Sequence, residues 1–149
     1  MIKKVKKTII GWREWVSLPE LGIENIKAKV DTGARTSALH AFDVKIKEAN
    51  GNHTVDFKMH PLQDDSDYVV ECHANIIDQR QVTDSGGHQE RRLVIQTSLV
   101  IGQQTFPIEM TLTDRDTMKF RMLLGRTALK PYFIVDPAKS YKTRKNIKS

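Results

Sequence analysis

The sequence lacks long hydrophobic runs and contains only one cysteine, Cys72, among its 149 residues. One cysteine excludes an internal disulfide and a four-cysteine zinc site, and it fits the reducing conditions of the cytoplasm. No apolar run approaches the roughly 18 residues that a membrane-spanning helix needs. The apolar stretch after the N-terminal lysines is interrupted by Arg13 and Glu14 before a signal-peptide core could form. We therefore expect a soluble cytoplasmic protein that does not enter a membrane.

Motifs for metal, nucleotide and serine chemistry are also absent. There is no Gly-x-Ser-x-Gly segment, and no glycine-rich loop ends in the Gly-Lys-Ser/Thr of a phosphate-binding site. No two histidines have the i, i+4 spacing with an adjacent glutamate that zinc peptidases use. We expect no metal and no cofactor, and we interpret the histidines as surface residues: His40, His53, His60, His73 and His88.

Clear helical periodicity is missing as well. Apolar and polar residues instead alternate along Ile26–Val30 and along residues 42–47, and Asn50-Gly51 then supplies a pair typical of a two-residue hairpin turn. Similar alternation marks residues 55–59, 69–77, 93–101, 106–112 and 120–124, with Cys72 on the apolar side of its segment. The pattern predicts one all-β domain, a barrel or a sandwich, with at most one short helix after Gly125.

Charge is distributed unevenly along the chain. The formal net charge is +6, but residues 1–13 and 139–149 each carry five basic and no acidic residues. The remaining residues carry 14 basic and 18 acidic side chains, a net charge of −4. Terminal runs of like charge are usually solvated. We therefore expect a domain over residues 1–138 and a solvated basic tail at 139–149, and nucleic acid is not the expected partner.

One acidic residue, Asp31, follows the strand predicted for Ile26–Val30 and begins a tight loop that runs to Ser37. Gly33 allows this loop to turn so that backbone N–H groups approach the carboxylate, and the Thr32 hydroxyl can contact a second copy of the loop. Two carboxylates a few ångströms apart share a proton and take complementary roles in activating water. Because Asp-x-Gly turns also end strands without any chemistry, these residues alone leave the role of Asp31 open.

A second segment, Met122-Leu123-Leu124-Gly125-Arg126, is an apolar strand that ends in Gly-Arg. Together with the Asp-Thr-Gly-Ala loop it resembles the retropepsin-type aspartic peptidases, in which such a strand packs behind the catalytic loop. Over the longer strings at residues 29–40 and 112–126, the chain is similar to a bacterial family labelled ATP-dependent zinc proteases. Members of that family often occur beside an ATP-grasp ligase that adds glutamates to a ribosomal protein.

The resemblance implies a single-domain, retropepsin-like closed β-barrel that forms a homodimer, with Asp31 as the catalytic residue of each chain. The residues that shape and support the active-site loop would be Thr32, Gly33, Ala34, Leu123, Leu124 and Gly125. The residues that would bind substrate are Arg35, Arg126, and Gly86 and Gly87 at the tip of a candidate flap over residues 82–92. Retropepsins commonly have an acidic residue where this chain has Arg35, so the usual ion pair with Arg126 is not expected.

These assignments predict an aspartic peptidase that hydrolyses peptide bonds with one Asp31 carboxylate from each of two chains. The arginines and the family context favour an acidic, glutamate-rich peptide substrate and a functional link to an ATP-grasp glutamate ligase. Two alternatives stay open. One is a non-catalytic all-β binding module for ribosomal or RNA partners, in which Asp31 only ends a strand, and the other is a zinc-dependent peptidase.

Overall fold

The computed structural model describes residues 6–62, 67–83, 86–114 and 119–144, and it is mostly β-strand, 62%. Six strands form a closed β-barrel, and a short α-helix, α1 (Arg126–Leu129), follows Gly125 directly. The expectation of an all-β closed barrel with a short helix after Gly125 is therefore confirmed. No helix in the described ranges is long and apolar enough to cross a membrane.

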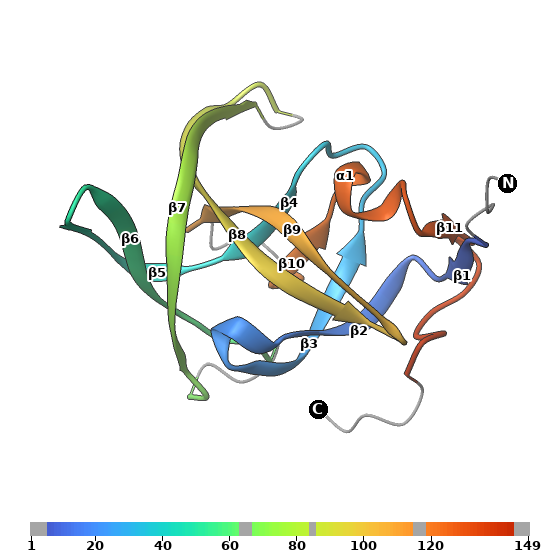
Figure 1. The fold of residues 1–149 in the computed structure, drawn as a ribbon. Coiled ribbons are helices and arrows are strands. Elements are labelled where there is room, and N and C mark those ends of the chain that lie inside the picture. The colour runs from blue at the N-terminus through green and yellow to red at the C-terminus, as the bar shows by residue number, and fades with distance from the viewer. Residues whose placement is uncertain (1–5, 63–66, 84–85, 115–118, 145–149) are drawn as a thin grey trace, which may run out of the picture.

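The strands fall into three groups, which Figure 1 shows. The barrel consists of β2 (Arg13–Leu18), β3 (Ile23–Val30), β4 (Ser37–His40), β8 (Gln89–Ile101), β9 (Gln104–Thr113) and β10 (Met122–Leu124). Beyond β8 the sheet continues through β7 (Val70–Thr83), β6 (Asn52–Met59) and β5 (Phe42–Ala49). A separate two-stranded sheet pairs β1 (Thr8–Ile10) with β11 (Phe133–Val135), and a 3₁₀ turn spans Pro19–Leu21.

The barrel closes because its first and last strands meet. Its strands run in the order β2-β3-β10-β4-β9-β8, and Ser17 of β2 lies opposite Val100 of β8. The hairpin turn predicted between β5 and β6 is confirmed, since Asn50 and Gly51 have positive φ angles of 54° and 78°. The lobe formed by β5, β6 and β7 therefore projects from a barrel that is complete without it.

Side-chain alternation decides which residues of a barrel strand reach the core. Ile26, Ala28 and Val30 of β3 are 0, 0 and 8% exposed, as their period-two spacing predicts. Every residue of β4 is buried, and this includes His40 at 4% exposure. The interpretation of His40 as a surface residue is therefore wrong, because β4 runs between β10 and β9 with neither face open to solvent.

Cys72 is a core residue, as its place in the alternating pattern predicts. It is 5% exposed, and burial raises the pKa of its thiol to about 12. The thiol therefore stays protonated near neutral pH, where the thiolate is the form that reacts.

The hairpin of β7 and β8 is longer than the alternation indicates. The pattern predicts strands over residues 69–77 and 93–101, whereas β7 continues to Thr83 and β8 begins at Gln89. Apart from Val82 the added residues are polar, and many of them are exposed, because the hairpin extends beyond the barrel (Figure 1). Gly87 has a φ of 83°, a conformation that glycine adopts without strain in a turn.

The described part of the tail expected at 139–149, residues 139–144, makes backbone contacts with the barrel. Residues 139–144 run along β2, where Tyr141 N donates a 2.9 Å hydrogen bond to Arg13 O. Residues 145–149 lie outside the described ranges. The division of the chain into a domain and a tail stays a prediction.

The anchor of this segment is the carboxylate of Glu14, which has no exposed surface. It accepts hydrogen bonds from Gly11 N at 2.7 Å, from Lys142 N at 3.0 Å, and from both N and Oγ1 of Thr143 at 3.0 Å. A buried carboxylate is costly unless donors replace its water. Four donors meet that need here, and three of them come from Lys142 and Thr143, so this one acidic side chain helps to hold the basic segment to the barrel.

Replacing Glu14 with alanine should lower the free energy of unfolding by about 3 kcal/mol, because several buried donors lose a charged acceptor. Urea titration measures this change. Glu24→Ala is the matched control, since Glu24 is exposed on the neighbouring strand β3, and it should change stability by less than about 0.5 kcal/mol. Equal effects of the two substitutions would contradict the anchoring role of Glu14.

Candidate active site

The loop that carries Asp31, residues 31–36, is held by a strand that is distant in the sequence. β10 pairs in parallel with β3, and Leu124 lies opposite Val30. Asp31 N then donates a hydrogen bond of 2.9 Å to Leu124 O. Asp31 is thus fixed where β3 leaves the sheet, beside the apolar strand that the resemblance assigned as its support.

The Asp31 side chain is half-buried and is oriented by its own loop. Gly33 N donates to Asp31 Oδ1 at 3.0 Å, and Ala34 N donates to Asp31 O at 3.2 Å. Thr32 and Gly33 are exposed. The surface around the carboxylate is therefore open to a substrate, to water or to a second chain.

Gly125 lets the end of β10 approach the other end of this loop. A Cβ atom on Gly125 would lie 2.6 Å from the carbonyl carbon of Thr36, closer than real Cβ atoms come. The Gly125 amide donates a 3.1 Å hydrogen bond to Ser37 Oγ. Both ends of the Asp31 loop are consequently attached to consecutive residues of one segment, Leu124 and Gly125.

The two arginines beside the loop have different surroundings. Arg126 Nη1 donates to Thr32 O and Gly33 O, at 3.1 Å each, and Arg126 N donates to Ala34 O at 2.8 Å. Arg126 therefore braces the loop through backbone carbonyls instead of through an acidic partner. Arg35 is exposed and forms no ion pair with any residue that the structure describes. Substrate binding by these arginines stays a prediction.

The candidate flap lies on the hairpin of β7 and β8. Gly86 and Gly87 are at its tip, and Figure 1 shows the tip and the loop between β3 and β4 at the same end of the barrel. Residues 84 and 85 of the candidate flap lie outside the described ranges. Closure of this hairpin over Asp31, and contact of its glycines with substrate, stay predictions.

A hollow of about 390 Å³ opens beside the Asp31 loop. Its lining combines cations with apolar side chains from α1 and β11: Lys7, Thr32, Arg126, Leu129, Lys130, Phe133 and Val135. The small β1–β11 sheet also exposes two directly paired isoleucines, Ile9 at 48% and Ile134 at 53%. Neighbouring exposed apolar side chains are typical of interaction surfaces.

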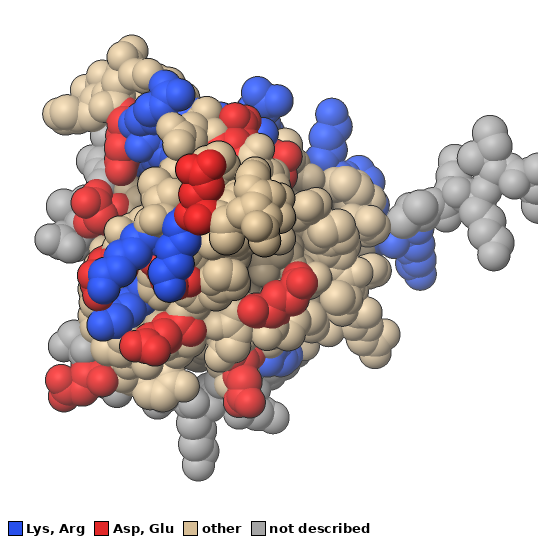
Figure 2. All heavy atoms as spheres, turned by 60° about the vertical axis from the view of Figure 1, so that its left-hand side comes forward, with Lys and Arg blue, Asp and Glu red and all other residues tan. Residues whose placement is uncertain are grey.

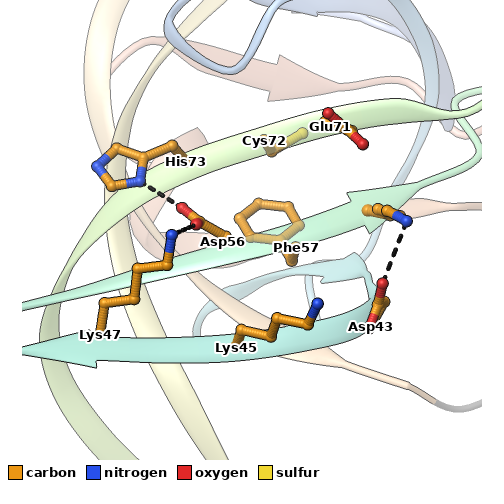
Figure 3. A pocket seen from close by; sticks show the side chains of 9 residues that line it. Asp43, Lys45, Lys47, Asp56, Phe57, Glu71, Cys72 and His73 are labelled. Carbon is orange, nitrogen blue, oxygen red and sulfur yellow. Dashed lines mark hydrogen bonds and ion pairs between the residues drawn. The ribbon is translucent and has the colours of Figure 1, made fainter.

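A larger hollow, about 450 Å³, lies on β5, β6 and β7, and no residue of the Asp31 loop lines it (Figure 3). Its charges largely neutralise one another. Asp56 contacts His73 Nδ1 and Lys47 Nζ, both at 2.6 Å, and Lys58 pairs with Asp43 at 3.2 Å. His73 and then Lys47 lower the pKa of Asp56. Figure 2 shows the same mixture of signs across this side of the molecule, so we do not assign an ionic ligand to it.

Two buried polar residues for which the sequence predicts no role also belong to the site. Ser37 has no exposed surface, and Thr111, 2% exposed, donates from Oγ1 to Ser37 O at 3.3 Å. Ser37 is the last residue of the Asp-Thr-Gly-Ala-Arg-Thr-Ser string, and this position in the motif could have indicated that it belongs to the site. Thr111 lies in an alternating strand that gives no such signal. Among the described residues, no three His, Cys, Asp or Glu side chains are grouped so that they could hold a metal ion.

Comparison with known proteins covers most of the chain. Residues 9–146 match the model of a family described as RimB-like, "Retropepsin-like aspartic endopeptidase RimB". A Desulfotalea psychrophila protein named "Probable alpha-L-glutamate ligase" is 46% identical over 138 residues, which make up 93% of this chain and 30% of that protein. A Parasynechococcus marenigrum protein of the same name is 45% identical over 136 residues, 91% of this chain and 29% of that protein. The chain thus spans about 30% of the length of these curated relatives.

A solved structure shares the fold. The crystal structure of protein Lpg0085 from Legionella pneumophila, described as having unknown function, superposes with a TM-score of 0.78. The match is 24% identical and covers 93% of this chain and 100% of that chain. At this level of identity the likeness supports the barrel and carries no functional information. None of these descriptions contains the zinc-protease wording of the family that the sequence strings resemble.

Replacing Gly125 with alanine should destabilise the fold by about 3 kcal/mol, because the added methyl group meets rigid backbone at Thr36. Chemical denaturation measures the loss. Gly33→Ala is the control within the same site, because a Cβ there meets only Asp31 Oδ1, at 3.2 Å. We expect Gly33→Ala to cost less than about 1 kcal/mol. A Gly125→Ala protein as stable as the wild type would show that this close approach is not a constraint.

Proposed function

Because the chain belongs to the RimB-like family of retropepsin-like aspartic endopeptidases, we propose that it hydrolyses peptide bonds with Asp31 as its catalytic carboxylate. The observation that carries the proposal is the attachment of the Asp31 loop at both ends, by Leu124 O and the Gly125 amide, with Arg126 bracing its middle. A catalytic carboxylate benefits from such fixation, because small displacements from the reactive geometry are costly.

The second carboxylate of the mechanism comes from a second copy of the chain. One Asp31, ionised, accepts a proton from the attacking water, while the other, protonated, donates a hydrogen bond to the carbonyl oxygen of the scissile bond. Two neighbouring carboxylates share one proton because both cannot remain ionised at close range. The proposed chemistry therefore requires a homodimer.

Exposed groups beside Asp31 support a surface for this second copy. Thr32 is exposed and borders the 390 Å³ hollow, whose lining includes Phe133 of β11. The same β11 pairs with β1, where Ile9 and Ile134 are about half exposed. Burial of these apolar side chains would favour association. We propose that the β1–β11 sheet faces the partner and brings the two Asp31 loops together.

The substrate class that we favour is an acidic peptide. Arg35 is exposed without an ion pair to a described residue, and Lys7 and Lys130 border the hollow next to Thr32. Such cations attract and orient carboxylates. The domain accounts for about 30% of relatives named "Probable alpha-L-glutamate ligase", which favours glutamate-rich tails as the substrate and a glutamate ligase as a functional partner. The β7–β8 hairpin would cover the bound peptide.

An Asp31→Asn protein should fold and dimerise but hydrolyse peptides at least about 100-fold more slowly, because it loses the ionisable group that activates water. The assay compares glutamate-rich and neutral peptides of equal length, each with and without a metal chelator. Asp43→Asn, an exposed acid on β5, is the control and should keep full activity. Undiminished hydrolysis by Asp31→Asn would overturn the mechanism, and loss of wild-type activity with the chelator would favour the zinc-dependent alternative.

An Ile134→Lys protein should be monomeric at concentrations where the wild type is a dimer, and its peptidase activity should fall in proportion. The physical reason is that a charge would enter an apolar contact. Ile46→Lys is the matched control, because Ile46 is similarly exposed, 55%, but lies on β5. Analytical ultracentrifugation and activity at matched concentrations measure the two effects. Unchanged dimerisation of Ile134→Lys would exclude the β1–β11 surface as the interface.

A further inference from the structure

A chain of hydrogen bonds connects the β7–β8 hairpin to the Asp31 loop. Near the start of β8, Arg92 Nε donates to Glu90 Oε2 at 3.1 Å, and Arg92 Nη1 donates to Thr111 Oγ1 at 3.4 Å. Thr111 Oγ1 donates onward to Ser37 O at 3.3 Å. Because Ser37 directly follows the Asp31 loop, these hydrogen bonds connect the barrel end of the hairpin, at Arg92, to the end of that loop.

Three members of this series of hydrogen bonds are shielded from water, whereas the Glu90 side chain is 31% exposed. Ser37 and Thr111 are 0 and 2% exposed, and the Arg92 side chain is 10% exposed. Arginine is rarely buried to this extent unless it is paired. Its partner Glu90 also accepts a hydrogen bond from Thr113 Oγ1 at 3.4 Å. Buried groups such as Thr111 and Ser37 cannot readily replace a lost partner with water, so a movement of Arg92 that breaks its bond to Thr111 leaves a buried oxygen without that donor.

We propose that Arg92 is a positioning residue, which acts through Thr111 to set the β7–β8 hairpin relative to the Asp31 loop. This inference rests on the proposed function, because it takes the hairpin as the element that closes over the peptide. Thr111 is the connecting group: its one hydroxyl proton goes to Ser37 O, and a lone pair accepts from Arg92. Thr111→Val keeps the shape of the side chain and removes both hydrogen bonds.

β8 provides a matched control in Thr97. Thr97 is also buried, 3% exposed, and its hydroxyl has no hydrogen-bond partner among the residues that the structure describes. Thr97→Val therefore makes the same chemical change in the same barrel without removing any of the hydrogen bonds between Arg92, Thr111 and Ser37. Since it removes an unpaired buried hydroxyl, the fold should be at least as stable as the wild type.

Residue-resolved amide hydrogen exchange provides a readout that needs no activity. In Thr111→Val, the amides of residues 89–92 and of Gly125 should exchange about 3- to 10-fold faster than in the wild type, a change on the scale of one lost hydrogen bond. In Thr97→Val they should exchange at the wild-type rate. Thr111→Ser should restore slow exchange, because its hydroxyl can make the same two contacts.

Peptide hydrolysis provides the second readout. We expect Thr111→Val to lower kcat about 3- to 10-fold with KM nearly unchanged, Thr111→Ser to restore kcat, and Thr97→Val to behave as the wild type. Arg92→Lys should lower kcat as Thr111→Val does, because an ammonium cannot bridge Glu90 and Thr111 as the guanidinium fork does.

The outcomes separate the inference from the function on which it rests. If Thr111→Val matches Thr97→Val in both exchange and kcat, the positioning role is overturned. If the wild type hydrolyses no peptide while Thr111→Val still accelerates exchange at residues 89–92 and Gly125, the proposed function fails and the connection between hairpin and loop stands.

Discussion

The close approach of Gly125 to the Thr36 backbone is the contact on which the site depends. It lets β10 lie between β3 and β4, so that Leu124 and Gly125 hold the two ends of the Asp31 loop. The Gly125–Ser37 hydrogen bond joins residues 88 positions apart in the sequence. Such long-range pairing is slow to form in β proteins, because the entropy of closing the long loop opposes it. The geometry of the loop therefore depends on the completed barrel and not on the Asp-Thr-Gly motif alone.

The alternating pattern was sufficient to predict the barrel strands β3, β8, β9 and β10, but it did not mark β2 or β4. The period-two run Ile26–Val30 and the Asn50-Gly51 pair determine a strand face and a turn through their own residues, and both agree with the structure. The end of β7 could not be predicted in this way. Residues 78–83 are polar except for Val82, and they form a strand because β8 pairs with them beyond the barrel. That cause lies elsewhere in the chain.

The same distinction applies to the site. The two motif strings predicted that Asp31 lies beside Leu124 and Gly125. The structure agrees, because the strand that ends at Asp31 pairs with the strand that ends at Leu124. The hydrogen bonds from Arg126 to the loop could not be predicted from the sequence, since they depend on where the Thr32 and Gly33 carbonyls point. The burial of the Glu14 carboxylate could not be predicted for a similar reason. Its four donors come from two ends of the chain, and no spacing along the sequence marks a carboxylate that backbone amides will surround.

The buried thiol of Cys72 gives this protein an internal reporter of its own opening. Because the chain has one cysteine, a thiol-specific label added to the native protein can modify one position only. That position lies on β7, opposite Phe57 of β6, within the lobe of β5, β6 and β7 that the barrel does not need for closure. The rate of labelling thus measures how often the Cys72 side chain becomes exposed by local opening of β6 and β7. The measurement needs no substitution in the protein.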